Sequence, residues 1–312
     1  MDSKTDIVPN YNSLAGALVD LFGSSVAITQ TDRLSGGDIN KAYAVTLNTG
    51  DTIFMKANEK EKAASFIAEA SGIFAIAQTG AIRVPKILCV GTDDGQEVGY
   101  SFLLMEFVKS AEPKADYWER FAQELAALHQ ADANAFCERD DGQKGRFGFF
   151  EDNFIGASPQ DNSPSESWID FFRDKRLLPQ FKAADSYLTS ADRENATKLL
   201  DHLDEFLIEP KAPSLLHGDL WSGNAMAGPD GKAMLIDPAA YVGACEADLA
   251  MTELFGGFPP NFYQAYRAAN PLEDGYEKRR DLYNLYQLLN HLNLFGQSYL
   301  NAVRSVVQEY VG

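Results

Sequence analysis

The sequence is poor in cysteine and in long apolar runs, and each shortage excludes a class of protein. Only three cysteines occur in 312 residues, Cys89, Cys137 and Cys245, and no two of them form a CxxC motif. This excludes a disulfide framework and a cysteine-ligated zinc site, and we expect a reducing, cytoplasmic setting. No run of about 18 apolar residues is present, so we expect no transmembrane helix. The polar opening "MDSKTDIVPNYN" also lacks the apolar core of a signal peptide.

Basic residues are scarce as well. The chain holds 27 lysines and arginines against 45 aspartates and glutamates, which gives a formal net charge of −18. Such a surface repels phosphate backbones and anionic lipids, so we expect neither a nucleic acid nor a membrane as partner. The acidity can serve solubility alone, or it can favour a cationic or amine-bearing substrate, and both interpretations stay open at this stage.

The first third of the chain is predicted to be rich in strands. Apolar residues at helical spacing between a polar cap and a glycine predict a helix at 12–23. Three strands are predicted within 27–58 and two more within 85–108, because short apolar stretches alternate there with turn residues. A helix at 61–80 lies between these groups. The expected unit is therefore a small five-stranded antiparallel β lobe with one inserted helix.

The remainder is predicted to be mainly helical. The polar segment 109–116 indicates a lobe boundary, which divides the chain into a lobe at 1–108 and a larger one at 109–312. Helices are predicted at 116–131, 165–184, 191–207, 246–255, 259–268 and 276–310, the last broken at Gly296. The segment 140–164 resembles a loop, and 213–240 resembles a hairpin laid on the helical lobe. The fold class predicted is α+β with two lobes.

One motif in the second lobe points to chemistry. In "LLHGDLWSGNAMAGPDGKAMLIDPAA", Asp219 and Asn224 stand at the spacing D-x-x-x-x-N, and Asp237 ends the next apolar run. Phosphoryl transfer needs a carboxylate near the acceptor hydroxyl and oxygen ligands for Mg²⁺, and protein kinases place them in this order. We therefore predict Asp219 as the base or substrate-orienting residue, and Asn224 and Asp237 as magnesium ligands. The competing interpretation is three ordinary turn residues after strands.

The first lobe supplies the matching phosphate-binding parts. Gly36 and Gly37 lie between two predicted strands, where a glycine flap would cover phosphates, although two such glycines also suit a simple turn. Lys56 lies in the third strand and would grip the ATP phosphates, and Glu69 on the following helix would orient it. The alternative for Lys56 and Glu69 is a solvated ion pair.

The adenine edge is predicted at the end of the fifth strand. In "LLMEFV", the backbone of Glu106 and Val108 would meet the base, and Met105 would lie behind it. These three residues come directly before the predicted lobe boundary, as a nucleotide cleft between two lobes requires.

The sequence resembles the fructosamine kinase (ketosamine kinase) family, which belongs with the aminoglycoside phosphotransferases and choline kinases of protein-kinase-like fold. The resemblance runs from "SGGDINKAY" to "FGQSY". Its more specific blocks are "TGAIRVPKIL" (79–88), "FGFFEDNFIGASPQDN" (147–162), "IDPAAYVGACEADLAMTELFGGF" (236–258) and "LYNLYQLLNHLNLFGQSY" (282–299).

The resemblance implies an ATP- and Mg²⁺-dependent kinase that phosphorylates the C3 hydroxyl of a ketosamine, the sugar adduct of a glycated amine. The product is unstable and releases the amine. By the same resemblance, Asp248 in "EADLA" supports the catalytic-loop backbone and His217 braces that loop. Trp221 and Glu246 are candidate substrate contacts, although Trp221 can equally be a packing residue. Each role for Lys56, Glu69, Asp219, Asn224 and Asp237 agrees with the one inferred above from spacing.

This chain departs from the family pattern at Ala244, Cys245 and Gln287, where relatives carry other residues. These departures leave the choice of sugar and amine open.

Two other function classes remain. An aminoglycoside or amino-alcohol phosphotransferase would use the same fold and an acidic acceptor lobe. A non-catalytic nucleotide-binding module would normally lack one of the lysine or carboxylate positions, all of which are present here.

Overall fold

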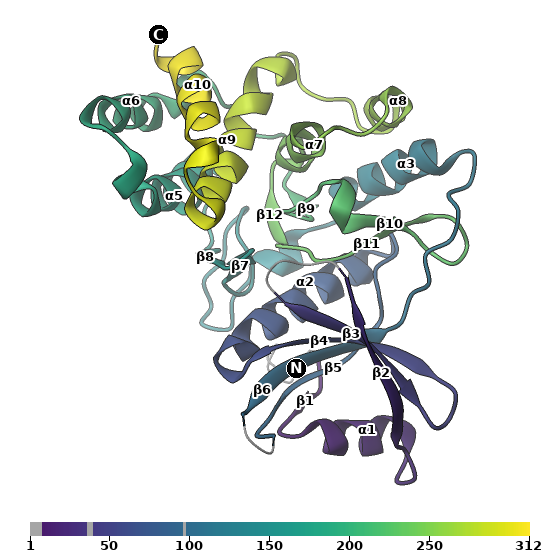
Figure 1. Ribbon diagram of the computed structural model, residues 1–312. Helices are drawn as coiled ribbons and strands as arrows, with labels where there is room; N and C mark the ends of the chain where they lie inside the picture. The colour runs from purple at the N-terminus through teal and green to yellow at the C-terminus, as the bar shows by residue number, and fades with distance from the viewer. Residues whose placement is uncertain (1–7, 36–39, 96–97) are drawn as a thin grey trace. The chain divides into compact units, whose positions relative to one another are not determined.

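The computed structural model of the protein describes residues 8–35, 40–95 and 98–312, which form two compact units (Figure 1). The first unit comprises Met1–Tyr117 and Met226–Asp237, and the second comprises Trp118–Ala225 and Pro238–Gly312. The chain thus returns once to its first unit before completing the second.

A six-stranded sheet forms the first unit, in the order β1-β5-β6-β4-β3-β2. Its strands are β1 (Asn10–Tyr11), β2 (Ile28–Leu34), β3 (Lys41–Leu47), β4 (Thr52–Glu59), β5 (Ile87–Asp93) and β6 (Tyr100–Glu106). The five predicted strands are present and pair antiparallel. The sixth, β1, pairs parallel with β5 and is too short to leave an alternating pattern in the sequence.

Strand alternation divides the side chains of β4 between two helices. Ile53, Met55 and Ala57 pack in one apolar cluster with Ala17 and Leu18 of α1 (Leu14–Phe22). Successive residues of a strand point to opposite faces, so Lys56 points away from this cluster. On that other face its ammonium group meets α2 (Ala63–Thr79), the inserted helix that was predicted.

The second unit is mainly helical, as predicted. Its helices are α3 (Tyr117–Gln130), α4 (Trp168–Phe172), α5 (Leu178–Ala183), α6 (Ser190–Asp201), α7 (Cys245–Leu254), α8 (Pro260–Ala269), α9 (Tyr276–Phe295) and α10 (Leu300–Val311). A π-helical turn, Arg173–Leu177, joins α4 to α5. Gly296 ends α9 with a φ of 90°, which confirms the predicted break. In the described ranges, no helix has the length and apolarity to cross a membrane.

The hairpin predicted for 213–240 is wrong. Strand β9 (Ser214–Leu216) pairs with β12 (Tyr241–Gly243), and β10 (Ala225–Ala227) pairs with β11 (Ala233–Leu235). Three residues per strand do not specify a partner locally, so the two apolar runs joined different ladders. Leu235 N–H also donates to the Arg83 carbonyl, and the strand pair belongs to the first unit rather than to the helical one.

A further hairpin lies inside the segment that resembled a loop. Strands β7 (Asn153–Ile155) and β8 (Ser158–Gln160) pair antiparallel. Their polar residues carry no apolar alternation, which is why the sequence did not predict them.

Asp192 joins the start of α6 to α10. Its carboxylate closes a capping box with Thr189 and accepts two bonds from Arg304, at 2.9 Å from Nε and 2.7 Å from Nη2. Although partial burial alone would raise it, the pKa of Asp192 lies well below its usual range, chiefly because Arg304 bonds to the carboxylate.

We expect Asp192→Ala to lower the free energy of unfolding by about 1 kcal/mol, as loss of a helix cap typically does. A lowered carboxyl pKa stabilises the folded state above the usual value and loses that effect as the pH falls below it. The difference in melting temperature from wild type should therefore be full at neutral pH and shrink below the ordinary aspartate pKa of 3.8. Asp201→Ala, at the other end of the same helix, is the control, and an equal loss there would contradict this assignment.

Candidate active site

Lys56 lies between two carboxylates of the first unit. Its Nζ is 2.7 Å from Glu69 Oε1 on α2 and 2.6 Å from Asp237 Oδ1 at the end of β11. Lys56 is 7% exposed, whereas the Asp237 side chain is 42% exposed. Asp237 therefore has one side open to a ligand while the lysine holds the other.

The charges of this cluster depend on one another. Burial by itself lowers the pKa of Lys56, but Glu69 and Asp237 more than offset it and raise that pKa above its usual value. Burial raises the pKa of Glu69, Lys56 opposes this, and the nearby charge of Asp237 adds to the rise. Lys56 is therefore protonated and lies beside two acidic groups. A polyanion such as a nucleotide phosphate can take over part of the negative charge that these groups supply to the lysine.

The backbone at Asp237 adopts a left-handed conformation. Its φ is 55°, the only positive value among non-glycine residues in the described part of the chain. Aspartate tolerates this region better than most residues, yet the conformation costs free energy and is concentrated at functional sites. The turn aims the carboxylate of Asp237 at Lys56 directly after a buried strand.

The predicted adenine contacts lie at the end of β6. Met105 is 4% exposed, and the Glu106 N–H donates to the Lys86 carbonyl at 2.9 Å. Val108 follows the end of the strand. Gly36 and Gly37 lie outside the described residues, so their role as a phosphate flap stays a prediction.

In the second unit, the buried carboxylate of Asp248 holds the backbone of the catalytic loop. Its Oδ2 accepts from the His217 N–H at 2.7 Å, and its Oδ1 accepts from the Gly218 N–H at 2.8 Å. Burial alone would raise the pKa of Asp248, but bonds from His129 and the backbone lower it, so the group is ionised. Because a carboxylate only accepts, His129 Nε2 donates to Asp248 at 3.2 Å, and His129 Nδ1 lies 2.6 Å from the Tyr266 hydroxyl.

Gly218 is fixed from its other side as well. With a φ of 81°, it leaves no room for a side chain, because an added Cβ would lie 2.1 Å from the Ala239 carbonyl oxygen. Gln287 of α9 donates from Nε2 to the Gly218 carbonyl at 3.1 Å. Gln287 therefore contacts the backbone of the predicted catalytic loop directly.

Asp219 and Asn224 are brought together at the end of this loop. Asn224 Nδ2 donates to the Asp219 carbonyl oxygen and to Asp219 Oδ2, both at 2.9 Å. Since the amide nitrogen faces Asp219, Asn224 Oδ1 points away from it and remains suited to a metal. The predicted spacing D-x-x-x-x-N thus corresponds to direct side-chain contact.

The candidate substrate residues differ in what surrounds them. Trp221 is 38% exposed, and its ring lies over Gly223, where a Cβ would come within 2.4 Å of it. Glu246 is 6% exposed and pairs with Arg279 through two bonds of 2.8 and 2.6 Å. Trp221 is thus free to stack on a ligand, whereas Glu246 would reach one only by giving up Arg279.

Ala244 and Cys245, which the sequence analysis also singled out, lie at the start of α7. Ala244 occupies the N-cap position and offers no capping side chain. Burial raises the pKa of the Cys245 thiol to about 11, so this cysteine is a neutral packing group. All three cysteines of the chain are free.

The donors present fit a magnesium ion held partly by nucleotide. Among the described residues, no group of three or more histidines, cysteines, aspartates or glutamates could hold a metal by itself. Mg²⁺ in kinases is bound by one or two carboxylates together with phosphate oxygens, and the half-exposed carboxylate of Asp237 suits this role.

Several residues that shape this site were missed in the sequence. Arg279, which neutralises Glu246, lies in a predicted helix among charged neighbours that give no sign of burial. Arg176 is fully buried in the π-helical turn. No local signal marks its burial, because Asp174 and Lys175 directly precede it, although Leu177 and Leu178 follow.

The fructosamine kinase family model matches residues 11–312. A Synechocystis protein named as a ketoamine kinase is 38% identical over 300 residues, which cover 96% of each chain. The chloroplastic protein-ribulosamine 3-kinase of Arabidopsis thaliana is 38% identical over 294 residues, which cover 93% of this chain and 85% of that one.

Solved structures agree with these relatives. A structure from Haemophilus somnus titled as a fructosamine-3-kinase matches with a TM-score of 0.83 at 31% identity, covering 96% of this chain and 97% of the other. A choline/ethanolamine kinase family protein from Mesorhizobium loti, at 13% identity and a TM-score of 0.56, shares the fold. The predicted family and kinase-like fold are confirmed, and the chain belongs to the fructosamine kinase family.

Proposed function

We propose that the protein is an ATP- and Mg²⁺-dependent kinase that phosphorylates the C3 hydroxyl of ketosamines. The observation that carries this proposal is the Asp219–Asn224 pair on a loop whose backbone is held by ionised Asp248. The names of the relatives, ketoamine kinase and protein-ribulosamine 3-kinase, support the substrate class.

ATP would be held by the first unit. Lys56 would bind the phosphates while Glu69 keeps its ammonium group in place, and the edge of β6 from Met105 to Val108 would receive the base. Both carboxylates beside Lys56 compensate its charge before the nucleotide arrives, so the lysine can be buried without a large loss of stability.

Asn224 and Asp237 would hold Mg²⁺, which neutralises charge on the transferred phosphoryl group when bound. Asp237 contributes a charged oxygen and Asn224 a neutral one. Lys56 shares Asp237 Oδ1, so the second oxygen of that carboxylate is the one left for a metal.

Asp219 would accept the proton of the acceptor hydroxyl. Its carboxylate is oriented by Asn224 Nδ2, and its backbone follows Gly218, which is bonded on both sides. A base fixed in this way keeps the reacting oxygen in line with the phosphoryl group, which is most of what this chemistry needs.

Phosphorylation at C3 would lead to release of the amine. Enolisation of the C2 ketone toward C1 lets the C3–O bond break, and phosphate leaves far more readily than hydroxide. Water then hydrolyses the resulting C1=N bond, which yields the free amine and a deoxy dicarbonyl sugar.

The expected partner is a small ketosamine or a glycated amine on a larger molecule. The net charge of −18 suits an amine-bearing acceptor and disfavours nucleic acids and anionic membranes. We place the protein in the cytoplasm because its three cysteines are unpaired, although the Arabidopsis relative is named as chloroplastic.

Lys56→Met should chiefly weaken nucleotide binding, because it removes the only cation between Glu69 and Asp237. We expect the KM for ATP to rise on the order of 10-fold or more, as loss of one charge-assisted phosphate contact does. Exposed Lys62→Met is the control. ATP affinity measured by calorimetry would disprove the assignment if the Lys56 variant bound as tightly as wild type.

The two metal ligands should differ in strength. Asp237→Asn removes a charged ligand, so the Mg²⁺ concentration for half-maximal activity should rise and kcat should collapse. Asn224→Ala should do the same more mildly, because an amide attracts the ion less. A normal magnesium titration for the Asp237 variant would exclude it as a ligand.

Asp219→Asn should lower kcat on a ketosamine by ~10²–10⁴-fold, the usual contribution of a positioned proton acceptor. ATP affinity and melting temperature should stay near wild type, since the carboxylate is assigned to the acceptor. A turn-forming aspartate would give the reverse, early melting with intact activity per folded molecule. Measuring all three quantities on one purified variant separates the two.

A further inference from the structure

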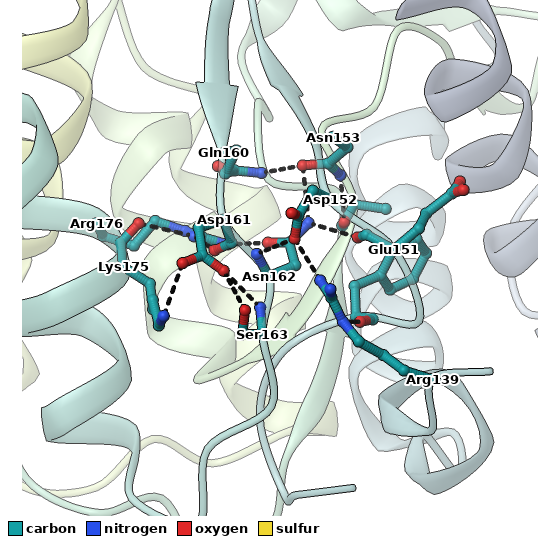
Figure 2. Close-up of polar contacts among 12 residues, drawn as sticks. Arg139, Glu151, Asp152, Asn153, Gln160, Asp161, Asn162, Ser163, Lys175 and Arg176 are labelled. Atoms are coloured by element: carbon teal, nitrogen blue, oxygen red, sulfur yellow. Dashed lines mark hydrogen bonds and ion pairs between the residues drawn. The ribbon is translucent and has the colours of Figure 1, made fainter. Parts of the chain in front are cut away.

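Four polar side chains of the second unit form one continuous hydrogen-bonded network, which ends on the backbone carbonyls of Ala239 and Ala240. We call Arg176, Asn162, Asn153 and Gln160 the amide relay. Figure 2 shows Arg176 beside Asn162, and Gln160 and Asn153 joined to each other above Asn162. None of them contacts the reacting groups described above, so the proposed function leaves their burial unexplained.

Arg176 sets the direction of the hydrogen bonds that run through Asn162 and Asn153 to the Ala240 carbonyl. A guanidinium group only donates, so Asn162 Oδ1 must face Arg176 Nη2, at 2.6 Å. Asn162 Nδ2 then points to Asn153 Oδ1 at 2.9 Å, and Asn153 Nδ2 donates to the Ala240 carbonyl at 2.7 Å. The orientation of each amide therefore follows from the one before it.

A branch of the relay reaches the neighbouring carbonyl. The Tyr286 hydroxyl donates to Gln160 Oε1 at 2.6 Å, which turns Gln160 Nε2 toward Asn153 Oδ1 at 2.7 Å and the Ala239 carbonyl at 3.3 Å. Two consecutive carbonyls are thus held by amides of one hairpin.

Arg176 is an unusual start for such a chain. It is fully buried and, in the described part of the protein, makes no ion pair; its charge rests on carbonyl oxygens and on the rings of Tyr241 and Phe171, 4.0 and 4.6 Å away. A buried cation without a carboxylate is costly, and its Nε finds no partner there. The arrangement is better explained by the need for a donor of fixed direction than by stability.

The held segment is bonded to the catalytic loop. Ala239 N–H donates to the His217 carbonyl at 2.9 Å, and the Ala239 carbonyl closes the space beside Gly218. Asp219 follows Gly218 directly. A shift of Ala239 and Ala240 would therefore move the backbone that carries the proposed base.

We propose that the amide relay is a positioning device for Asp219, so that the rate of phosphoryl transfer depends on the direction of its hydrogen bonds. This inference rests on the proposed function. It names Asn153, Gln160, Asn162 and Arg176 as positioning residues that act through the 239–240 backbone.

Asn162→Asp tests direction separately from stability. The new carboxylate keeps the bond to Arg176 and neutralises its charge, so the fold should be at least as stable. The new carboxylate cannot donate to Asn153 Oδ1. Either the two oxygens then face each other, or the Asn153 amide flips and the Ala240 carbonyl loses its donor. We expect kcat to fall on the order of 10-fold or more while the KM for ATP stays within about two-fold.

Asn293→Asp is the matched control. Asn293 also donates from Nδ2 to a buried partner, the Gln180 side chain at 2.6 Å, and in the described part of the chain it makes no direct hydrogen bond with Asn153, Gln160, Asn162 or Arg176. Its kcat should stay near wild type. Gln160→Glu is the second relay variant, because it keeps the Tyr286 bond and loses only the donor, and it decides the question if Asn162→Asp does not fold.

Hydrogen exchange gives a readout that needs no acceptor. In both relay variants the peptide that contains Ala239 should exchange faster than in wild type, and in Asn293→Asp it should not. Unchanged kcat in the relay variants overturns the inference. If wild type phosphorylates no ketosamine, the proposed function fails, and exchange alone decides: faster exchange supports the relay and unchanged exchange refutes it.

Discussion

The proposed chemistry of the second unit depends on the two hydrogen bonds that Asp248 accepts from consecutive backbone N–H groups. Its two oxygens each take one N–H, from His217 and Gly218, and its charge is kept by His129. An ionised carboxylate without water is stable only when such donors surround it. The carboxylate of Asp248 keeps both hydrogen bonds only when the loop adopts one conformation. In that conformation Asp219 lies beside Asn224.

In the first unit, the buried charge is a cation, the ammonium group of Lys56. Lys56 is acceptable on the α2 face of the sheet because Glu69 and Asp237 both lie within 2.7 Å of it. Removal of the lysine would leave two carboxylates beside each other without a cation, which is much more costly than loss of an ion pair at a surface. We propose that a polyanionic nucleotide reaches the same lysine from the side on which Asp237 is exposed.

The sequence predicted those parts whose signals are local. Alternating apolar residues marked β2 to β6, and the break of the last helix followed from Gly296. Lys56 contacts Glu69 in the first unit, and Asp219 contacts Asn224 in the second, as the sequence suggested, although their roles remain proposals. Three-residue strands such as β9 and β12 carry no local information about their partner, so the hairpin at 213–240 was mispredicted. The relay could not be predicted, because asparagines and glutamines in a loop-like segment usually face water, and only the fold brings Arg176 beside them.

Acceptor identity is the central claim, and one assay tests it most directly. Purified protein with ATP and Mg²⁺ is presented with ribulosamines, fructosamines, erythrulosamines and aminoglycosides, and the phosphorylated carbon is located by phosphorus-coupled NMR. The account predicts ATP consumption with ketosamines only, phosphate on C3, and later release of free amine. Consumption with aminoglycosides but with no ketosamine would contradict it.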